Sequence, residues 1–397
     1  MKMLVACRFP ERALADLRSL GSEVVYEPAV SAEDLGKHLR DVAILIIGRT
    51  RVAADAIDAA PDLQMIVKGG SDISTIAVEE ASRLGVFVSS SPGRDSVAIA
   101  EYALTLALAL DRSLGARQEA ARAAERPEQA PAHGLQGRTL GILPIDGAGR
   151  ELARRARAFG MRVLAWAPTV DADAPVVRDV EMCAWPTELA QQSDILVSVA
   201  RPGAWQEVLA NADVIDNLPS GGSFIHIGHP GAFSEDTLAT AVRHRGVRAA
   251  LDLWLSEYRS DAIRFKTDLL DLPGVIYTRG AAGGTEQARE AIAEEVVRIV
   301  RRFLVSGEVV NCVNLLERSP ATWQLVLRLR DTVGVMAAIM DAIQDDGINA
   351  EEILSRVFVG AKAAWCTISL TERPSTDALD TIRGIDGVIH MELRAVV

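Results

Sequence analysis

Short apolar runs alternate with amphipathic stretches along roughly the first quarter of the chain. Each run has the length and the Val/Ile content of a buried strand, whereas stretches such as 11–20 and 31–42 carry apolar residues at helical spacing. The apolar runs are KMLVAC (2–7), EVVYEP (23–28), AILIIG (43–48), QMIVKGG (64–70) and VFVSSS (86–91). This alternation predicts βαβ units on a parallel sheet.

The same alternation resumes after a change in composition. Residues 115–137 are rich in Ala, Arg, Glu and Pro, which is typical of a surface helix followed by a connector, and we expect a domain boundary there. The second series of apolar runs is TLGILPI (139–145), RVLAWAP (162–168), DILVSVA (194–200), SFIHIGH (223–229), VRAALDLWL (247–255) and GVIYTRG (274–280). It predicts a second doubly wound α/β domain.

The last part of the chain has a different order of elements. An amphipathic stretch, 285–308, and a short connector, 316–322, precede a β-α-β-β-α-β pattern over 323–397. This order is that of a ferredoxin-like domain. We therefore expect an α/β protein with two Rossmann-like domains and a small α+β domain at the C-terminus.

Composition narrows the class of protein. The 397 residues exceed what one hydrophobic core usually serves, and a hydrophobic fraction of 49% supplies two or three cores. The net charge of -12, without a long Lys/Arg run, argues against nucleic acid and anionic membranes as partners. The four cysteines are scattered, so we expect a cytoplasmic protein with neither a metal site nor a disulfide framework.

Several long blocks of sequence carry a resemblance to a known family. They are AVEEASRLGVFVSSSPGRDSVAIAEYALTLALALDR (77–112), LQGRTLGILPIDGAGRELARRARAFGMRVLAW (135–166), LPSGGSFIHIGHPGAFSEDTLATAV (218–242), AALDLWLSE (249–257) and TRGAAGGTEQA (278–288). In this order they resemble the D-2-hydroxyacid dehydrogenase family, and most closely its D-3-phosphoglycerate dehydrogenases that end in an ACT regulatory domain.

The resemblance implies a division into three domains. Residues 1–112 and 295–318 would form a substrate domain, residues 113–294 an NAD-binding domain, and residues 319–397 the ACT domain. In that family the active site lies in the cleft between the first two domains. Its members are usually homodimers or homotetramers, and we expect such an oligomer here.

The turn after the first strand of the second series departs from the dinucleotide fingerprint. In GILPIDGAGR (141–150), the positions of the three fingerprint glycines hold Pro144, Asp146 and Gly149. Proline lacks an N–H and fixes its φ, and aspartate places a negative charge beside a dianionic ligand. At roughly 4 Å and an effective dielectric of about 20, that contact costs on the order of 4 kcal/mol, which is about a thousandfold in affinity.

Two interpretations of this turn stay open. In the first, the βαβ unit is kept for packing and binds NAD(H) weakly or not at all, since a fold can outlast its site. In the second, NAD binding is retained, and Gly147, Gly149 and Arg150 remain the candidates for contact with the dinucleotide. Ala167, after the next strand, replaces the carboxylate that would bind the adenosine ribose.

The resemblance also implies three catalytic positions, a His paired with a Glu and an Arg. The Arg position holds His229, the Glu position holds Glu257, and the His position holds Gly280, which cannot accept a proton. His229 and Glu257 are therefore the candidate catalytic residues, because an imidazole beside a carboxylate can act as acid or base. His226, earlier in the same strand, is better explained as a hydrogen-bonded, half-buried residue.

The positions that bind substrate in the family are also altered in this chain, as the cofactor and catalytic positions are. Arg49 lies where it could reach a substrate phosphate, although Ile47 and Gly48 replace the Arg-Ser pair of the family. Asp72 stands in the loop that would offer N–H groups to a substrate carboxylate, and Asp95 replaces an asparagine that contacts substrate in the family. Two carboxylates disfavour an acidic substrate.

The C-terminal segment LVLRLRDTVGVMAAIMDAIQDDGIN (325–349) resembles the strand, turn and helix of an ACT domain. Gly334 permits close approach of the backbone, and Asp331 and Asn349 are candidates to hydrogen-bond the ammonium group of an amino acid. Equally open is edge-to-edge pairing of two such domains without a ligand. WQLVLRLR (323–330) would otherwise be an exposed apolar strand.

The altered positions concern cofactor binding, proton transfer and substrate binding together. We therefore expect a family member that has lost the NAD-dependent hydride transfer and acts as a binding, regulatory or partner protein. One alternative is an active oxidoreductase on the CH-OH group of a 2-hydroxy acid, with a remodelled NAD site or with altered chemistry through His229 and Glu257. Another is an amino-acid sensor that acts through the ACT domain.

Overall fold

The structure, a computed structural model, describes most of the chain and divides it into two units. The described residues are 1–124, 132–168, 179–200, 210–228, 230–253, 268–316 and 318–396. The first unit is Met1–Asn314 and the second is Leu315–Val397. Each unit has its own sheets and its own hydrophobic core, and they are described in turn.

The first series of apolar runs forms a five-stranded parallel sheet in the order β2-β1-β3-β4-β5. Its strands are β1 (Lys2–Ala6), β2 (Glu23–Tyr26), β3 (Ile44–Ile47), β4 (Met65–Lys68) and β5 (Phe87–Ser89). The intervening helices are α1 (Glu11–Arg18), α2 (Leu35–His38), α3 (Ala54–Asp58) and α4 (Val78–Arg83). Every residue of β3 and β4 is buried, as expected for a parallel sheet covered on both faces.

The second series forms a seven-stranded parallel sheet in the order β12-β11-β10-β9-β6-β7-β8. Its strands are β6 (Thr139–Leu143), β7 (Arg162–Ala165), β8 (Glu181–Met182), β9 (Ile195–Ala200), β10 (Ser223–Gly228), β11 (Arg248–Leu253) and β12 (Val275–Thr278). The strand order reverses between β6 and β9. In open α/β sheets, ligands bind at the carboxyl ends of the strands beside such a reversal.

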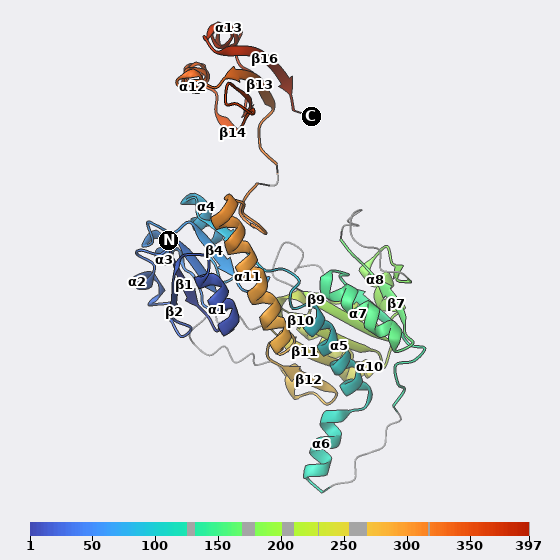
Figure 1. The fold of residues 1–397 in the computed structure, drawn as a ribbon. Coiled ribbons are helices and arrows are strands. Elements are labelled where there is room, and N and C mark those ends of the chain that lie inside the picture. The colour runs from blue at the N-terminus through green and yellow to red at the C-terminus, as the bar shows by residue number, and fades with distance from the viewer. Residues whose placement is uncertain are drawn as a thin grey trace. The chain divides into compact units, whose positions relative to one another are not determined.

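Helices of several lengths accompany this sheet. They are α5 (Ser96–Asp111), α6 (Leu114–Arg122), α7 (Gly147–Ala158), α8 (Pro186–Gln191), α9 (Ala212–Asp216), α10 (Glu235–Arg245), α11 (Glu286–Ser306) and the short 3₁₀ turns η2 (Pro230–Ala232) and η3 (Asp268–Asp271). The long α11 returns to the five-stranded sheet, where it packs against α1 and β4 (Figure 1). The doubly wound pattern predicted from the sequence is thus confirmed for both sheets.

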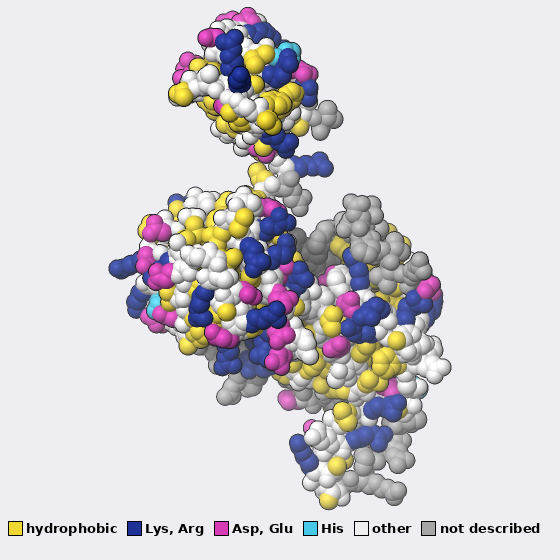
Figure 2. Space-filling view, viewed as in Figure 1, with side chains coloured by type: hydrophobic (Ala, Val, Ile, Leu, Met, Phe, Trp, Pro, Cys, Tyr) yellow, Lys and Arg dark blue, Asp and Glu magenta, His cyan; other side chains and the backbone are white. Residues whose placement is uncertain are grey.

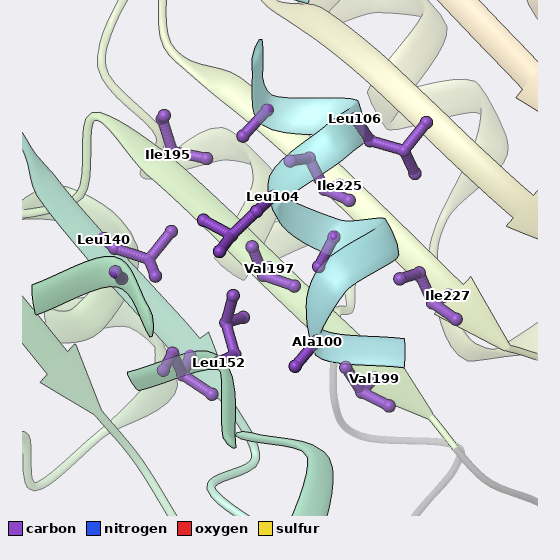
Figure 3. Packing of buried hydrophobic residues seen from close by; sticks show 14 of the residues in the cluster. Ala100, Leu104, Leu106, Leu140, Leu152, Ile195, Val197, Val199, Ile225 and Ile227 are labelled. Atoms are coloured by element: carbon purple, nitrogen blue, oxygen red, sulfur yellow. The ribbon is translucent and has the colours of Figure 1, made fainter. Parts of the chain in front are cut away.

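Apolar residues of α5 and α7 cover one face of the seven-stranded sheet. Figure 3 shows Leu104 of α5 lying close to Val197 of β9, and Leu152 of α7 belongs to the same buried cluster. Ile225 and Ile227 of β10 continue that cluster under α5. This packing fixes the axis of α7, and with it the position of its first residues at the strand reversal.

The second unit has the predicted β-α-β-β-α-β order. It consists of β13 (Trp323–Arg330), α12 (Val335–Asp345), β14 (Ala350–Val357), β15 (Ala363–Leu370), α13 (Thr376–Gly384) and β16 (Val388–Ala395). The four strands form an antiparallel sheet in the order β14-β15-β13-β16. Its core joins the sheet to both helices through residues such as Leu327, Ile339 and Ile382.

The prediction that residues 323–330 form an exposed edge strand of this unit is wrong. WQLVLRLR (323–330) is β13, which pairs with β15 on one side and β16 on the other, so its backbone is paired at both edges. An apolar strand is buried most completely at the centre of a sheet, and the alternating pattern alone does not distinguish centre from edge. In the described chain β14 is an edge strand, and it exposes Ile353 and Leu354.

The surface carries both signs of charge. In Figure 2, Lys/Arg and Asp/Glu side chains are interspersed over the visible face of the first unit. The surface helix expected within 115–137 is α6, none of whose own residues is buried in the part of the chain that the structure describes. Among the described helices, none combines the length and the apolar character that a membrane span requires.

The core under α7 gives a direct test of this packing. Leu152→Ala removes a fully buried side chain and should lower the free energy of unfolding by about 2 to 5 kcal/mol. The same change at Leu114, whose side chain is exposed on α6, should alter it by less than about 0.5 kcal/mol. Denaturant unfolding of both variants measures the difference, and equal effects would contradict the packing described for α7.

Candidate functional site

The first turn of α7 lies at the strand reversal and is capped by the chain's own carboxylate. Asp146 is the N-cap residue, and its Oδ1 accepts a hydrogen bond from the Gly149 N–H at 2.9 Å. Pro144, two residues earlier, offers no N–H, and its peptide bond with Leu143 is cis. Such a cap contributes about 1 kcal/mol to a helix and occupies a donor that would otherwise face a bound anion.

Gly149 keeps the packing role of the third fingerprint glycine. A Cβ built on it would lie 2.9 Å from Ile142 Cγ2 and 3.0 Å from the Pro144 carbonyl oxygen. Real Cβ atoms essentially never come within 3.0 Å of another heavy atom, so a side chain here would displace Ile142 or push α7 away from β6. The strand and helix of the dinucleotide unit are therefore packed as the fingerprint requires, while the turn between them differs.

The start of α5 lies against the start of α7. A Cβ built on Gly147 would be 3.0 Å from Ser96 Oγ, and α5 and α7 are in extensive contact. Ser96 is 5% exposed, and its hydroxyl is one of two buried side-chain groups without a hydrogen-bond partner among the described residues. Both helices direct their positive N-terminal dipoles toward this point, which favours negative charge there.

Asp95 connects this point to the loop after β12. A Cβ built on Gly283 would lie 3.8 Å from Asp95 Oδ2, so the loop that carries Gly280 passes close to the α5 N-cap. Gly280 has a φ of +58°, a conformation that side chains rarely adopt. Gly280, which the sequence analysis aligned with the family's histidine, thus has neither a proton acceptor in a side chain nor an ordinary backbone conformation.

Asp252 is a buried carboxylate that the sequence analysis missed. It lies in β11 with no exposed surface, and it accepts hydrogen bonds from Thr278 Oγ1 at 2.7 Å and from the N–H groups of Ala281 and Ala282 at 2.9 Å each. Asp252 therefore fixes the loop that contains Gly280. The available signal was a single carboxylate inside an otherwise apolar strand.

Lys68 is a second missed residue. It ends β4, is 5% exposed, and its Nζ donates to the Gly48 carbonyl oxygen and, at 3.5 Å, to Thr75 Oγ1. Burial lowers the pKa of Lys68, and the nearby carboxylate of Asp72 opposes that shift. Burial also raises the pKa of the neighbouring Cys7 thiol to about 11, so this thiol is protonated at neutral pH.

The predicted substrate residues lie in two places. Arg49 is exposed just after β3, and its charge acts on Lys68, which sets it at the carboxyl edge of the five-stranded sheet with Asp72. Asp72 Oδ1 accepts from the Ser74 N–H at 2.9 Å and so closes its own turn. Asp95 belongs instead to the group at the α5 and α7 N-termini.

The structure does not describe the predicted catalytic pair, but it does describe the neighbouring His226. His229 and Glu257 lie outside the described residues. His226 is fully buried in β10, where its Nδ1 lies 3.2 Å from Ser198 Oγ and its ring packs against Phe233. This supports the expected structural role, although burial is complete rather than partial.

The remaining cofactor candidates also have defined positions. Arg150 is half-buried, and its N–H donates to the Asp146 carbonyl oxygen at 2.9 Å as part of the first turn. Gly147 is exposed, next to Ser96. Among the residues that the structure describes, no group of three or more His, Cys, Asp or Glu side chains could hold a metal ion.

The predicted ligand residues of the C-terminal unit do not meet within one chain. Asp331 and Gly334 follow β13, next to the start of β15, whereas Asn349 precedes β14, next to the end of β15. The two groups therefore lie at opposite ends of the sheet of one copy, and their binding of an ammonium group stays a prediction. Strand direction, which periodicity does not reveal, decides this outcome.

Comparisons with known proteins agree with this fold. The family model described as "D-isomer specific 2-hydroxyacid dehydrogenase, NAD binding domain" matches residues 104–279. A hydroxypyruvate reductase of Thermotoga maritima is 30% identical over 277 residues, which are 68% of this chain and 88% of that protein.

Two further relatives extend the match. A D-3-phosphoglycerate dehydrogenase of Archaeoglobus fulgidus is 27% identical over 351 residues, 85% of this chain, and the chain spans 64% of that protein's length. A crystal structure of a Thermus thermophilus protein has a TM-score of 0.67 at 26% identity. The match covers 79% of this chain and 100% of that one.

The role of Asp252 can be tested by removing its carboxylate. Asp252→Ala should lower the free energy of unfolding by roughly 2 to 4 kcal/mol, because two backbone N–H groups lose their acceptor. Hydrogen exchange at Ala281 and Ala282 should rise in the native state. Asp271→Ala, at an exposed position, is the control, and unchanged exchange in Asp252→Ala would refute the assigned role.

Proposed function

Because the chain belongs to the D-2-hydroxyacid dehydrogenase family, we propose that it has lost the NAD-dependent hydride transfer of its relatives and acts as a ligand-binding, regulatory member. The observation that carries this proposal is the hydrogen bond from the Gly149 N–H to the Asp146 carboxylate. In this proposal the protein is a cytoplasmic oligomer that binds small molecules and does not oxidise or reduce them.

The residues at the first turn of α7 do not fit a pyrophosphate. A dinucleotide needs the helix N-terminal N–H groups and a close approach of backbone, which glycines allow. Here Asp146 supplies a carboxylate to the Gly149 N–H, and Pro144 has no donor. A pyrophosphate would meet a like charge or displace the cap, at a cost on the order of 4 kcal/mol, about a thousandfold in affinity.

The position that would exchange the substrate proton gives further support. Gly280 has no side chain, and Asp252 holds its loop in place through Thr278 and two N–H groups. Hydride transfer from a carbon that bears a hydroxyl group requires a base to accept the hydroxyl proton. A fixed loop without a proton acceptor does not supply that base. Loss of cofactor binding and loss of the base reinforce each other in this proposal.

An active oxidoreductase is the second candidate function. The family model names an NAD-binding domain, and the relatives include a hydroxypyruvate reductase. In this candidate His229 and Glu257 would supply acid-base chemistry. Lys68 and Arg49, at the carboxyl edge of the first sheet, would attract a carboxylate, while Asp72 and Asp95 would weaken binding of a strongly anionic substrate such as a phosphorylated acid.

Replacement of Asp146 separates these two candidates. NADH should not bind measurably to the wild-type protein at micromolar concentrations, and Asp146→Gly should tighten binding, by up to about a thousandfold. Asp146→Asn removes the charge alone and should give part of that gain. Isothermal titration calorimetry measures all three, with Asp236→Asn, in the first turn of α10, as the charge-matched control.

The opposite outcome is equally clear. Micromolar NAD(H) affinity of the wild-type protein, together with measurable oxidation of a 2-hydroxy acid, would contradict the proposal and favour the oxidoreductase. In that case His229→Ala decides whether the imidazole takes part, since a catalytic His229 requires the activity to fall.

The C-terminal unit suggests a role in assembly and sensing. We propose that it is an ACT-type domain that pairs with a second copy through β14. In the described chain β14 bonds to β15 on one side only, and its exposed apolar residues, Ile353 and Leu354, are unusual for a free edge. An edge strand of this kind is protected when it pairs with another strand.

The sequence of β14 is complementary to itself in the antiparallel direction. Pairing about Leu354 sets Glu352 of one copy opposite Arg356 of the other, and opposite charges across strands stabilise a pair. The same register brings Asn349 of one copy beside Val359 of the other, near the turn in which the Asp331 N–H donates to the Lys362 carbonyl oxygen. An amino acid bound there would contact both copies.

A charge placed on the strand tests the pairing. Leu354→Lys should shift the protein to a smaller assembly, because a buried ammonium group at the centre of the paired strands lacks a partner. Ile389→Lys, at an exposed position on the opposite edge strand β16, is the matched control and should keep the wild-type mass. Light scattering after size-exclusion chromatography measures the mass, and an unchanged mass for Leu354→Lys would rule out this interface.

A further inference from the structure

The segment that leads to the C-terminal unit is bound along the edge of the five-stranded sheet. We call this segment, Asn311–Asn314, the tether. The Val313 N–H donates to the Val88 carbonyl oxygen at 2.8 Å, and the Ser90 N–H donates to the Asn311 carbonyl oxygen at 3.1 Å. The tether thus runs antiparallel to β5, and the second unit begins at the next residue, Leu315.

Each end of the tether is fixed by an asparagine side chain. Asn314 Oδ1 accepts from the Val88 N–H at 2.8 Å, and its Nδ2 donates to the Val86 carbonyl oxygen at 2.9 Å. Asn311 has a φ of +53°, and its Nδ2 donates to Glu295 Oε1 at 2.8 Å. The side chain of Asn311 therefore connects the tether to α11, whereas that of Asn314 connects it to β5, to the preceding Val86 and to Ser82 of α4.

Glu295 binds two separate parts of the first unit. It is 4% exposed, and while Oε1 accepts from Asn311 of the tether, Oε2 accepts from Arg94 Nη2 at 2.6 Å. Arg298, one turn later on α11, donates to both oxygens. These cations, with Arg298 the largest influence, hold the pKa of Glu295 at about 2, so the group stays ionised at neutral pH.

Arg94 is part of the turn that begins α5. It directly precedes Asp95, the N-cap of α5, and Ser96, whose hydroxyl lies against Gly147 at the start of α7. A change in the position of Arg94 therefore alters the place where the two helix N-termini meet. A buried carboxylate that loses one of its donors is costly, so the bonds of Glu295 to Asn311 and to Arg94 are not independent of each other.

We propose that Glu295 is a positioning residue that couples the tether of the C-terminal unit to the Arg94–Ser96 turn. Release of Asn311 then loosens the candidate site where the N-termini of α5 and α7 meet. This inference rests on the proposed function, since a regulatory member requires a route from the C-terminal unit to that site. The route is short: Asn311, Glu295 and Arg94 are linked by two hydrogen bonds.

Hydrogen exchange of the full chain tests this coupling without any ligand. Asn311→Ala should raise the exchange rate of the amides at the start of α5, including Ile99, whose N–H donates to the Asp95 carbonyl oxygen, by about tenfold. Glu295→Gln should have a similar effect. In the double variant the two effects should not add, because they remove the same connection.

Asn314→Ala is the matched control. It makes the same change three residues along the tether and removes bonds to Val86, Val88 and Ser82 without touching Glu295. It should raise exchange at Val88 and leave the start of α5 unchanged. The proposal is overturned if Asn311→Ala affects only the tether and β5, or if Asn314→Ala loosens α5 as much as Asn311→Ala does.

The single asparagine variants keep the test valid if Glu295→Gln folds poorly, because they leave the Glu295 carboxylate and its two arginines in place. The readout is also independent of NAD(H). If the wild-type protein binds NADH tightly, the proposed loss of function fails while the coupling can still be observed. If exchange at α5 is unchanged in Asn311→Ala, the coupling fails whatever the nicotinamide result.

Discussion

The close packing of α7 on β6 is the constraint on which the geometry at the strand reversal depends. Gly149 packs so closely on β6 that the N-terminal N–H groups of α7 are held at the strand reversal, and those groups need an acceptor. In dinucleotide-binding relatives of this fold class the ligand supplies it. Here the Asp146 carboxylate accepts from the Gly149 N–H, so one of these groups is satisfied from within the chain. In this turn the glycine that the packing of α7 on β6 requires is present, whereas the residues that would contact a dinucleotide differ.

Three buried charged residues elsewhere in the first unit hold loops in place through hydrogen bonds. Asp252 fixes the loop after β12, Glu295 joins the tether to the start of α5, and Lys68 ties the ends of β3 and β4 together. The charged group of each residue forms hydrogen bonds to backbone groups or to neighbouring side chains. A buried charge needs such partners. Such groups hold the loops in place whether or not the loops take part in a reaction.

The pattern of apolar residues was sufficient to predict both parallel sheets and the β-α-β-β-α-β order of the C-terminal unit, since periods of 2.0 and 3.6 residues report local structure directly. It could not predict that β13 is central, or that Asp331 and Asn349 lie at opposite ends of a sheet, because pairing and direction are long-range properties. The absence of two fingerprint glycines was visible in the sequence. The Asp146 cap and the contact of Ser96 with Gly147 required the structure.

The most direct test of the central claim is a crystal structure of the protein grown with millimolar NADH. The account predicts that Asp146 stays on the Gly149 N–H and that no dinucleotide density lies at the start of α7. Density for a pyrophosphate at that position, with the Asp146 side chain turned away, would contradict it and return the protein to the NAD-dependent dehydrogenases.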